Sequence, residues 1–266
     1  RVLELNSDGK VNTYTIVADV SVRYCRDGQI TASYTWNDSK DNTSYNGNVA
    51  NSATLYNMIV DDPRDLSKMS YSDNQFRHKV VLYGNLPSFH GFNVGVRYSG
   101  IGGTRYSMVV NGNINGDFVK GNDLAFVFDP NDSSVPQAIR DGINGLLENP
   151  DVDKSFKKYL RKSFGKIAER NGGINGFSGT WDVRVSKIFN FYKQQRLELS
   201  VDIFNVANLI DKKSGLTHNL GKQELLNCTG FDTATQTFKY TVNNAAGKKS
   251  PGGNPWQIQM GVKYMF

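Results

Sequence analysis

A strict alternation of apolar and polar residues recurs along much of this chain and limits the folds open to it. It is clearest in the last segment, WQIQMGVKYMF at 256–266. An extended strand turns successive side chains to opposite faces, so a period of two indicates a strand with one apolar face. Met265 is the one apolar residue on the polar side of this segment. The apolar side consists of Ile258, Met260, Val262, Tyr264 and Phe266.

Other segments repeat this pattern, and their polar sides carry Arg, Lys, Asp or Glu, which means that this side meets water. No run of 18 apolar residues occurs in the sequence, so a transmembrane helix is excluded. The sequence therefore predicts an all-β, antiparallel protein, although alternation alone also fits a soluble β-sandwich. The repeating segments lie at 13–24, 29–36, 76–86, 91–100, 180–188 and 196–205.

The lengths of the connections favour a transmembrane antiparallel β-barrel. Short turns are expected at 25–28, 86–91 and 190–194. Long insertions lie between these turns. Outer-membrane barrels show the same alternation, with long extracellular loops and short periplasmic turns. Soluble sandwiches do not separate their loops by length in this way. The long loops are expected at 37–74, 111–175 and 209–253.

Placing every short turn on the periplasmic side of the barrel limits how many strands lie between the turns. The stretch 92–110 must then be one long strand, with a kink or widening at its glycine-rich middle. The count is about seven strands, and residues 1–5 would be the stump of an eighth. The polar faces of the strands would line the lumen of the barrel. The candidates for lumen-facing charges are Arg184, Lys187, Arg196, Glu198, Asp202 and Lys263.

The longest loop contains two segments with helical spacing. Residues 133–149 begin with serines at an N-cap position and have Pro136 in the first turn. Residues 150–170 place acids early and bases late along an apolar stripe. We therefore expect two short amphipathic helices within about 134–170. They would either cap the mouth of the barrel or pack on themselves as a solvated loop domain.

The residues that could carry chemistry are few. Cys25 and Cys228 are expected to be free thiols, and the three histidines are far apart in the sequence without a nucleophile motif. The chain is therefore expected not to be an enzyme. Its formal net charge is +6, but the basic residues are dispersed and no recognition motif appears, so nucleic acid is not an expected partner.

One stretch, NGNINGDFVKGND at 111–123, has the spacing of a calcium-binding loop. Its first three oxygen positions are all Asn, and Asn122 stands where a bidentate Glu is needed, so a loop of Asn/Gly turns is the stronger expectation. A looser Ca²⁺ site in this extracellular loop, the only cofactor considered, would draw on Asn111, Asn113, Asn115, Asp117, Asp123 and Asp129.

Three of the stretches that carry a family resemblance are DNQFRHKVVLYGNLP at 73–87, LELSVDIFNVANLIDKKSG at 197–215 and WQIQMGVKYMF at 256–266. They resemble the late barrel of TonB-dependent outer-membrane receptors of the Oar-like branch, whose members carry a carboxypeptidase-regulatory-like domain. The resemblance covers about residue 10 to the end. The DIFNVANLIDKK element, Asp202–Lys213, is similar to the penultimate-strand signature of these receptors. The final strand, with its terminal aromatic residue, is similar to the signal read by the barrel-assembly machinery. Asn stands where the family loop often has Asp, which argues against family-based calcium binding.

The resemblance implies a multi-pass protein of the bacterial outer membrane. Such receptors have a 22-stranded barrel, a plug and a TonB box, and they take up a cargo, such as a peptide or another large nutrient, with energy supplied through TonB. Residues 1–266 would be roughly the last third of that barrel. The implied partners are outer-membrane lipid, the barrel-assembly machinery, the TonB complex through an N-terminal region outside this sequence, and a surface lipoprotein.

Two functions of other classes remain open. A small self-contained outer-membrane barrel could act as an adhesin or surface-binding protein, provided that RVLEL at 1–5 pairs with 256–266. A soluble carbohydrate- or peptide-binding sandwich would purify without detergent. An outer-membrane hydrolase is a more distant alternative, and it would require carboxylates and a histidine to converge in the loops.

Overall fold

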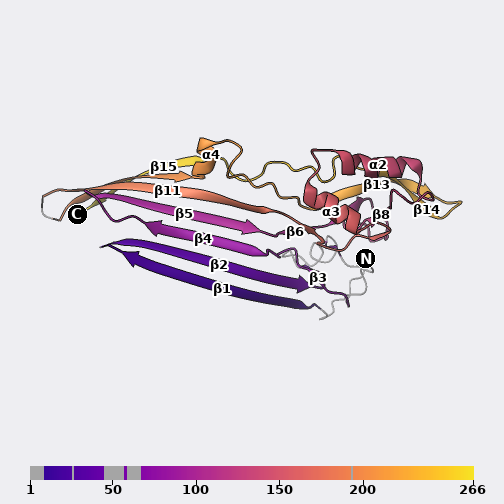
Figure 1. Ribbon diagram of the computed structural model, residues 1–266, viewed down its shortest axis with the longest axis horizontal. Coiled ribbons are helices and arrows are strands. Elements are labelled where there is room, and N and C mark those ends of the chain that lie inside the picture. Colours follow the sequence, from indigo (N-terminus) through magenta and orange to yellow (C-terminus); the bar gives the residue numbers. More distant parts are fainter. Residues whose placement is uncertain (1–8, 26, 45–56, 59–66, 193) are drawn as a thin grey trace.

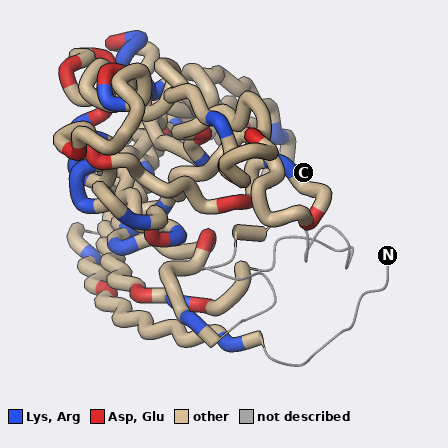
Figure 2. Tube along the Cα trace, turned by 90° about the vertical axis from the view of Figure 1, so that its right-hand side faces the viewer, with Lys and Arg blue, Asp and Glu red and all other residues tan. Residues whose placement is uncertain are grey.

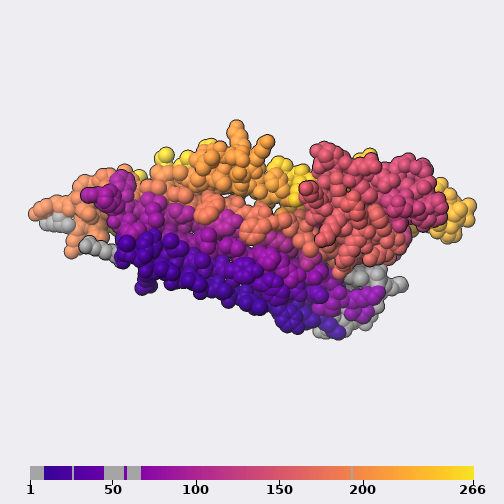
Figure 3. Space-filling model, viewed as in Figure 1, coloured from indigo at the N-terminus to yellow at the C-terminus, as the bar shows by residue number. Residues whose placement is uncertain are grey.

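The computed structural model describes residues 9–25, 27–44, 57–58, 67–192 and 194–266. Two parts follow one another along the long axis of the molecule: a sheet of long strands and a compact loop domain (Figure 1). In the space-filling view the long strands form one continuous surface that reaches the loop domain (Figure 3). No helix in the described ranges is long and apolar enough to cross a membrane.

The long strands form one antiparallel sheet in which each strand pairs with its predecessor and its successor among them. A short strand, β3 (Ser70–Tyr71), pairs with the end of β2. The predicted antiparallel all-β architecture is confirmed. In sheet order the long strands are β1 (Val11–Tyr24), β2 (Gly28–Asp41), β4 (His78–Asn85), β5 (Phe92–Gly102), β11 (Phe177–Asn190), β12 (Arg196–Phe204) and β15 (Gln257–Met265).

Within the described part of the chain this sheet does not close on itself. The edge strands β1 and β15 are not paired with each other. Seen from the loop-domain end, the chain below the loop domain follows an arc, and charged residues occur throughout the loop domain (Figure 2). Residues 1–5, which were predicted to contribute an eighth strand, lie outside the described residues.

The short turns lie where they were predicted, and each needs a residue with positive φ or a tight connection. Cys25 has φ 53° between β1 and β2, while His90 and Gly91 have φ 49° and 77° between β4 and β5. A Cβ atom on Gly91 would lie 2.7 Å from the backbone oxygen of Ile188. Glycine is therefore required at that position by both its backbone conformation and its close neighbour.

The register aligns apolar residues across neighbouring strands. Val94 of β5 pairs with Val185 of β11, which pairs with Val201 of β12, which pairs with Met260 of β15. Because side chains alternate between faces, all of these lie on one face, called here the apolar face. No second sheet covers it in the described structure, and Met260 at the edge is 79% exposed. The opposite face of the same sheet is called here the polar face.

The prediction of one strand over 92–110 was wrong. β5 ends at Gly102, and Gly103 follows with φ 75° and with Arg77 Cβ only 2.4 Å from where its own Cβ would lie. The chain stays extended after Gly103, but its next strands pair with strands outside the long sheet. β6 (Arg105–Tyr106) pairs with β10 (Gly173–Ile174), and β7 (Met108–Asn111) runs parallel to β13 (Gln223–Asp232).

Two long connections, 103–176 and 205–256, fold together into the loop domain. Its buried core is apolar and includes Met108, Ile143, Phe156, Leu160 and Leu225. Since β7 and β13 come from different connections, neither connection could bury this core alone. The remaining elements of the domain are α2 (Gln137–Glu148), α3 (Lys154–Lys162), β8 (Phe126–Val127), β9 (Lys166–Ile167) and β14 (Thr237–Val242). The short helix α4 (Val206–Ile210), at the start of the second connection, packs against β11 of the sheet instead (Figure 1).

The two predicted helices are confirmed, and they pack into this domain. The predicted serine N-cap of the first is wrong, because α2 begins after Pro136 without a side-chain cap. The hydroxyl of Ser134 bonds to Asp132 at 2.7 Å instead. Asp153 caps α3, accepting a hydrogen bond from the Ser155 amide at 2.8 Å.

Candidate binding surface on the polar face of the sheet

The polar face carries a charged cluster where β11 and β12 pair. Arg184 and Asp202 face each other in the register, and Arg184 Nη1 lies 3.1 and 3.0 Å from the two carboxylate oxygens of Asp202. Arg184 Nη2 lies 3.5 Å from Glu198 Oε1. The guanidinium group therefore bridges two carboxylates on the next strand and remains half exposed.

A shallow groove of about 350 Å³ lies over this cluster. Arg97 of β5 lies 4.0 Å from Asp182 of β11, opposite it in the register, and so adds a second ion pair. Both signs of charge are thus within reach of one ligand, as in a site for a polar or zwitterionic molecule. The polar-face residues that line the groove include Tyr83, Asn85, Arg97, Asp182, Arg184 and Asp202.

The register decides which predicted lumen charges share this face. Glu198 pairs with Lys263, and Arg196 lies two residues before Glu198 on the same strand. All three therefore join Arg184 and Asp202 on the polar face. The prediction for Lys187 was wrong. It lies an odd number of residues from Arg184 and therefore projects to the apolar face.

On the apolar face Lys187 finds aromatic neighbours. Its Nζ lies 4.2 Å from the ring centroid of Phe92 and 5.7 Å from that of Phe189, and it donates a hydrogen bond to the His90 carbonyl. A lysine can keep its charge beside an apolar surface when its ammonium group reaches such partners. Lys187 is therefore a cation at the turn end of the apolar face.

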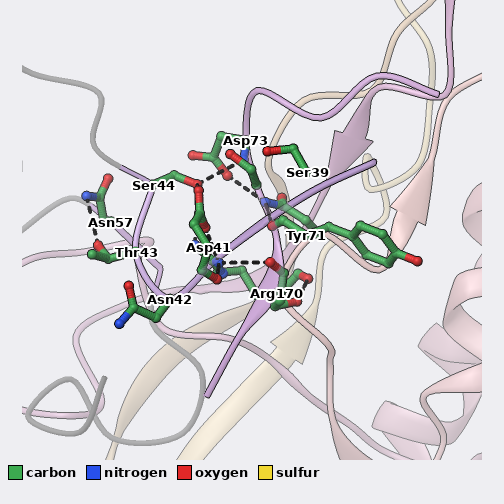
Figure 4. Close-up of polar contacts among 12 residues, drawn as sticks. Ser39, Asp41, Asn42, Thr43, Ser44, Asn57, Tyr71, Asp73 and Arg170 are labelled. Carbon is green, nitrogen blue, oxygen red and sulfur yellow. Dashed lines mark hydrogen bonds and ion pairs between the residues drawn. The ribbon is translucent and has the colours of Figure 1, made fainter. Parts of the chain in front are cut away.

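A buried network fastens the loop domain to the end of β2 (Figure 4). Arg170 is 1% exposed; its Nη2 donates to the Asp41 carboxylate and, at 2.5 Å, to the Asp41 carbonyl. Ser44 Oγ donates to Asp41 Oδ2 at 2.9 Å, and Ser70 Oγ donates to the Arg170 carbonyl at 2.6 Å. No local pattern in the sequence links Arg170 to Asp41, because the two residues are 129 positions apart.

Asn171 extends the same network to the start of the loop domain. Its Nδ2 donates to the Tyr71 carbonyl at 2.8 Å and to Asp73 Oδ1 at 2.6 Å, and its backbone amide donates to Ser107 Oγ at 2.8 Å. Asn171 has φ 56°, a conformation that Asn tolerates better than most residues. Three segments therefore meet at Asn171. They are β3, the start of the loop domain, and the end of that domain from which the chain continues to β11.

The DIFNVANLIDKK element builds a second junction, at the end of β12. The side chain of Asn205 donates to the carbonyls of Gly215 and Asn254, at 2.9 Å each. Asn208 donates to two carbonyls of its own loop, and its Oδ1 accepts the Trp256 amide at 3.2 Å. Two asparagines thus join the chain leaving β12 to the chain entering β15.

The stretch 111–123 does not assemble the predicted calcium ligands. Its side-chain oxygens accept hydrogen bonds from its own backbone: Asn113 from Gly116, Asn115 from Asp117, Asp117 from Val119, and Asp123 from Ile114. The outer two candidates bond elsewhere, Asn111 to Asn227 and Asp129 to Asn131. Burial raises the pKa of Asp123, which further disfavours a charged ligand there.

No group of three or more His, Cys, Asp or Glu side chains suited to a metal occurs among the described residues. Cys25 and Cys228 are both free, as predicted. The residues predicted to form the assembly signal all lie on or just beyond the exposed apolar side of β15. Their exposed fractions are 46% for Ile258, 79% for Met260, 74% for Val262, 52% for Tyr264 and 97% for Phe266.

Comparison with known proteins identifies no family. No family model matches the sequence, and no curated protein matches it. Among solved structures, the outer membrane transporter YddB from Escherichia coli is similar, with a TM-score of 0.42 and 13% sequence identity. The comparison covers 97% of this chain and 26% of the transporter, so this chain spans about a quarter of its length. A similarity of this size does not establish a shared function.

Proposed function

We propose that this chain is the C-terminal barrel portion of a TonB-dependent outer-membrane receptor that takes up a polar cargo through a plugged barrel. One observation carries the proposal: a single sheet keeps one uncovered apolar face in register across its strands while its opposite face carries ion pairs. Lipid offers no hydrogen-bond partners, so a spanning strand must present apolar side chains outward and keep polar side chains inside.

The dimensions of the strands agree with a membrane location. A tilted transmembrane strand needs about 9–11 residues. β1, β2 and β11 have 14 residues each, β5 has 11, β12 and β15 have nine, and of the long strands only β4, with eight, is shorter than this range. A soluble sandwich would need a second layer over the apolar face, and none covers it in the described structure.

The open edges of the described sheet call for further strands. Unpaired backbone groups cannot be left facing lipid, so β1 and β15 must each pair with another strand. Residues 1–5, through which a small barrel would close, lie outside the described residues. Further strands would complete a larger barrel, whose lumen could hold a plug. The Asp202–Lys213 element supports the TonB-dependent class.

The first experiment tests whether the apolar face contacts lipid. Met260 and Gln259 are consecutive on β15, and Arg is introduced at each in turn. Met260→Arg places a charge on the apolar face and should lower the folded amount recovered from the outer membrane, since Arg at the bilayer midplane costs about 2–4 kcal/mol. Gln259→Arg, the matched control on the polar face, should be tolerated. Equal recovery of the two variants would contradict membrane embedding.

The second experiment tests the receptor itself. The protein is extracted from its native membrane in mild detergent, and its intact mass and peptides are measured. A species several times heavier than the 29.6 kDa of this chain, with plug peptides, would support the receptor. A detergent-dependent species of 29.6 kDa would make the small barrel the better account, and the transport function would fall.

A further inference from the structure

The helix α3, KSFKKYLRK, concentrates the positive charge of the molecule. Five of its nine residues are Lys or Arg, and none is acidic. The whole chain has 31 basic and 25 acidic residues, a net charge of +6, so these nine residues supply a charge equal to five of the six. Outside α3 the charges nearly balance. The five cations are Lys154, Lys157, Lys158, Arg161 and Lys162.

These cations project away from the core. Phe156, Tyr159 and Leu160 are the buried residues of α3, and at roughly 100° per residue the basic side chains are centred on the opposite side. Lys154, Lys158 and Arg161 are exposed and have no ion pair within the described part of the chain. Like charges four residues apart destabilise a helix, so this arrangement is costly to the fold unless an anion neutralises it.

The position of α3 in the fold indicates which class of anion would bind to it. The hydroxyl of Ser155 lies 3.0 Å from that of Tyr106 in β6, which is drawn near α3 in Figure 1. The helix also packs beside β10. β6 and β10 continue the β5 and β11 strands, with two residues between the members of each pair. Phe177, where β11 and its apolar face begin, is 51% exposed. α3 therefore lies beside the end of the apolar face.

Exposed apolar side chains accompany the cations. Ile167 and Phe126 pair between β9 and β8 and are 49% and 41% exposed, and Ile174 of β10 is 47% exposed. A groove of about 250 Å³ between α3 and β9 contains Lys162, Ser163 and Lys166. Cations beside exposed apolar groups are typical of surfaces that bind a lipid leaflet, whereas a soluble polyanion requires only the cations.

We propose that the basic face of α3, made of Lys154, Lys158, Arg161 and Lys162, acts with Lys166 to bind the phosphate groups of a phosphorylated glycolipid in the outer leaflet. This inference rests on the proposed function, because it needs the apolar face to lie in the membrane. The ion pair of Lys162 with Glu169, 3.1 Å long, is solvent-exposed and can be displaced by a phosphate.

The test measures glycolipid binding to the protein purified in neutral detergent from its native membrane. Diphosphorylated lipid A and its dephosphorylated form are titrated, and bound lipid is counted by native mass spectrometry. The double variant Lys158→Gln/Arg161→Gln is compared with Lys120→Gln/Lys213→Gln, which removes two exposed lysines elsewhere. One cation near an anionic leaflet raises the binding constant about fivefold. The α3 variant loses two cations, so its affinity for phosphorylated lipid should fall roughly 25-fold.

Each outcome decides the proposal. Equal binding of the two lipid forms, or equal loss in both double variants, would overturn it. Displacement of lipid A by an equal concentration of inorganic pyrophosphate would assign the site to soluble phosphates instead. Should the α3 double variant fail to fold, the single variant Lys158→Gln is compared with Lys120→Gln instead, and an equal loss of phosphorylated lipid in both would overturn the proposal.

A parallel arm separates this inference from the proposed function. The protein is reconstituted into vesicles of phosphatidylcholine alone and washed with alkali. Loss of the protein from these vesicles would contradict membrane embedding. Retention in them, combined with no preference for phosphorylated lipid, would overturn only the role of α3.

Discussion

The guanidinium group of Arg170 donates hydrogen bonds to both the carboxylate and the carbonyl of Asp41, although the two residues are 129 positions apart. Their side chains are 1% and 4% exposed. A buried ion pair adds little net stability, since desolvation offsets the attraction, but removing one partner leaves an uncompensated charge. This pair therefore holds the loop domain in one position on the end of β2.

Replacing Asp41 with Asn should loosen the loop domain. The variant leaves the Arg170 charge buried without a counter-charge, a loss of about 3–5 kcal/mol in comparable pairs. Hydrogen exchange should therefore speed up at residues 70–71 and 170–173. Lys239→Gln is the control, because it breaks the exposed pair with Asp232 and should cost less than about 1 kcal/mol. Similar exchange in the two variants would contradict the role of the Arg170 pair.

The start of α3 should depend on pH through Asp153. Burial alone would raise the pKa of this carboxyl, but hydrogen bonds from Lys249 and Ser155 outweigh it and hold the pKa below its usual value. The resulting stability is present above the unfolded pKa of about 3.9 and is lost as pH falls through the lower folded pKa. Thermal unfolding of the loop domain should therefore shift downward only in that acidic range.

Two variants of Asp153 separate charge from capping. Asp153→Asn keeps an N-cap acceptor but loses the ion pair, so its deficit relative to the native protein should disappear at low pH. Asp153→Ala also loses the cap and should cost about 1 kcal/mol at neutral pH. A deficit of Asp153→Asn that stays constant with pH would show that the charge of Asp153 is not involved.

The junction at Asn208 should require an amide rather than a carboxylate. Its Nδ2 donates to the carbonyls of Lys212 and Ser214 at 3.0 Å each, and its side chain is buried. Asn208→Asp cannot donate, so both carbonyls lose their partner, at a cost of about 1–3 kcal/mol for a buried group. Hydrogen exchange at 211–214, the loop that these two bonds hold, should increase, whereas it should not change in Asn144→Ala, an exposed control. An unchanged exchange rate in Asn208→Asp would argue against the junction.

The last residue should matter for membrane assembly. Phe266 is 97% exposed and stacks on Tyr264 with ring centroids 6.2 Å apart, while Met265 pairs with Arg196 on the polar face. A charge at 266 falls among the apolar residues predicted to be the assembly signal, and a charge at 265 does not. Phe266→Asp should therefore reduce surface levels more than Met265→Asp, measured by surface labelling. Equal levels of the two variants would refute the predicted signal.

Much of this architecture follows from local sequence patterns. The period-two segments predicted the long antiparallel strands, and the helical spacing of the longest loop predicted α2 and α3. The positions of the short turns were also predicted correctly. These features depend on residues within one strand or one helical turn, so the chain records them locally.

The errors and omissions concern contacts between distant segments. Gly103 ends β5 because the next strands pair with other partners, and no local pattern reveals that change. The assignment of Lys187 failed through a shift of one position, which moves a strand residue to the other face. Arg170 and Asp41 carry no signal of each other in the sequence.

Local patterns in the chain thus set which segments become strands or helices and which side of each strand is apolar. Only folding brings residues 103–176 and 205–256 into one core, makes β7 and β13 run parallel, and packs α3 beside β10. The two kinds of feature differ in the sequence separation of the residues that produce them. Alternation is set by neighbouring residues, whereas burial of a shared core depends on segments that meet only after the chain has folded.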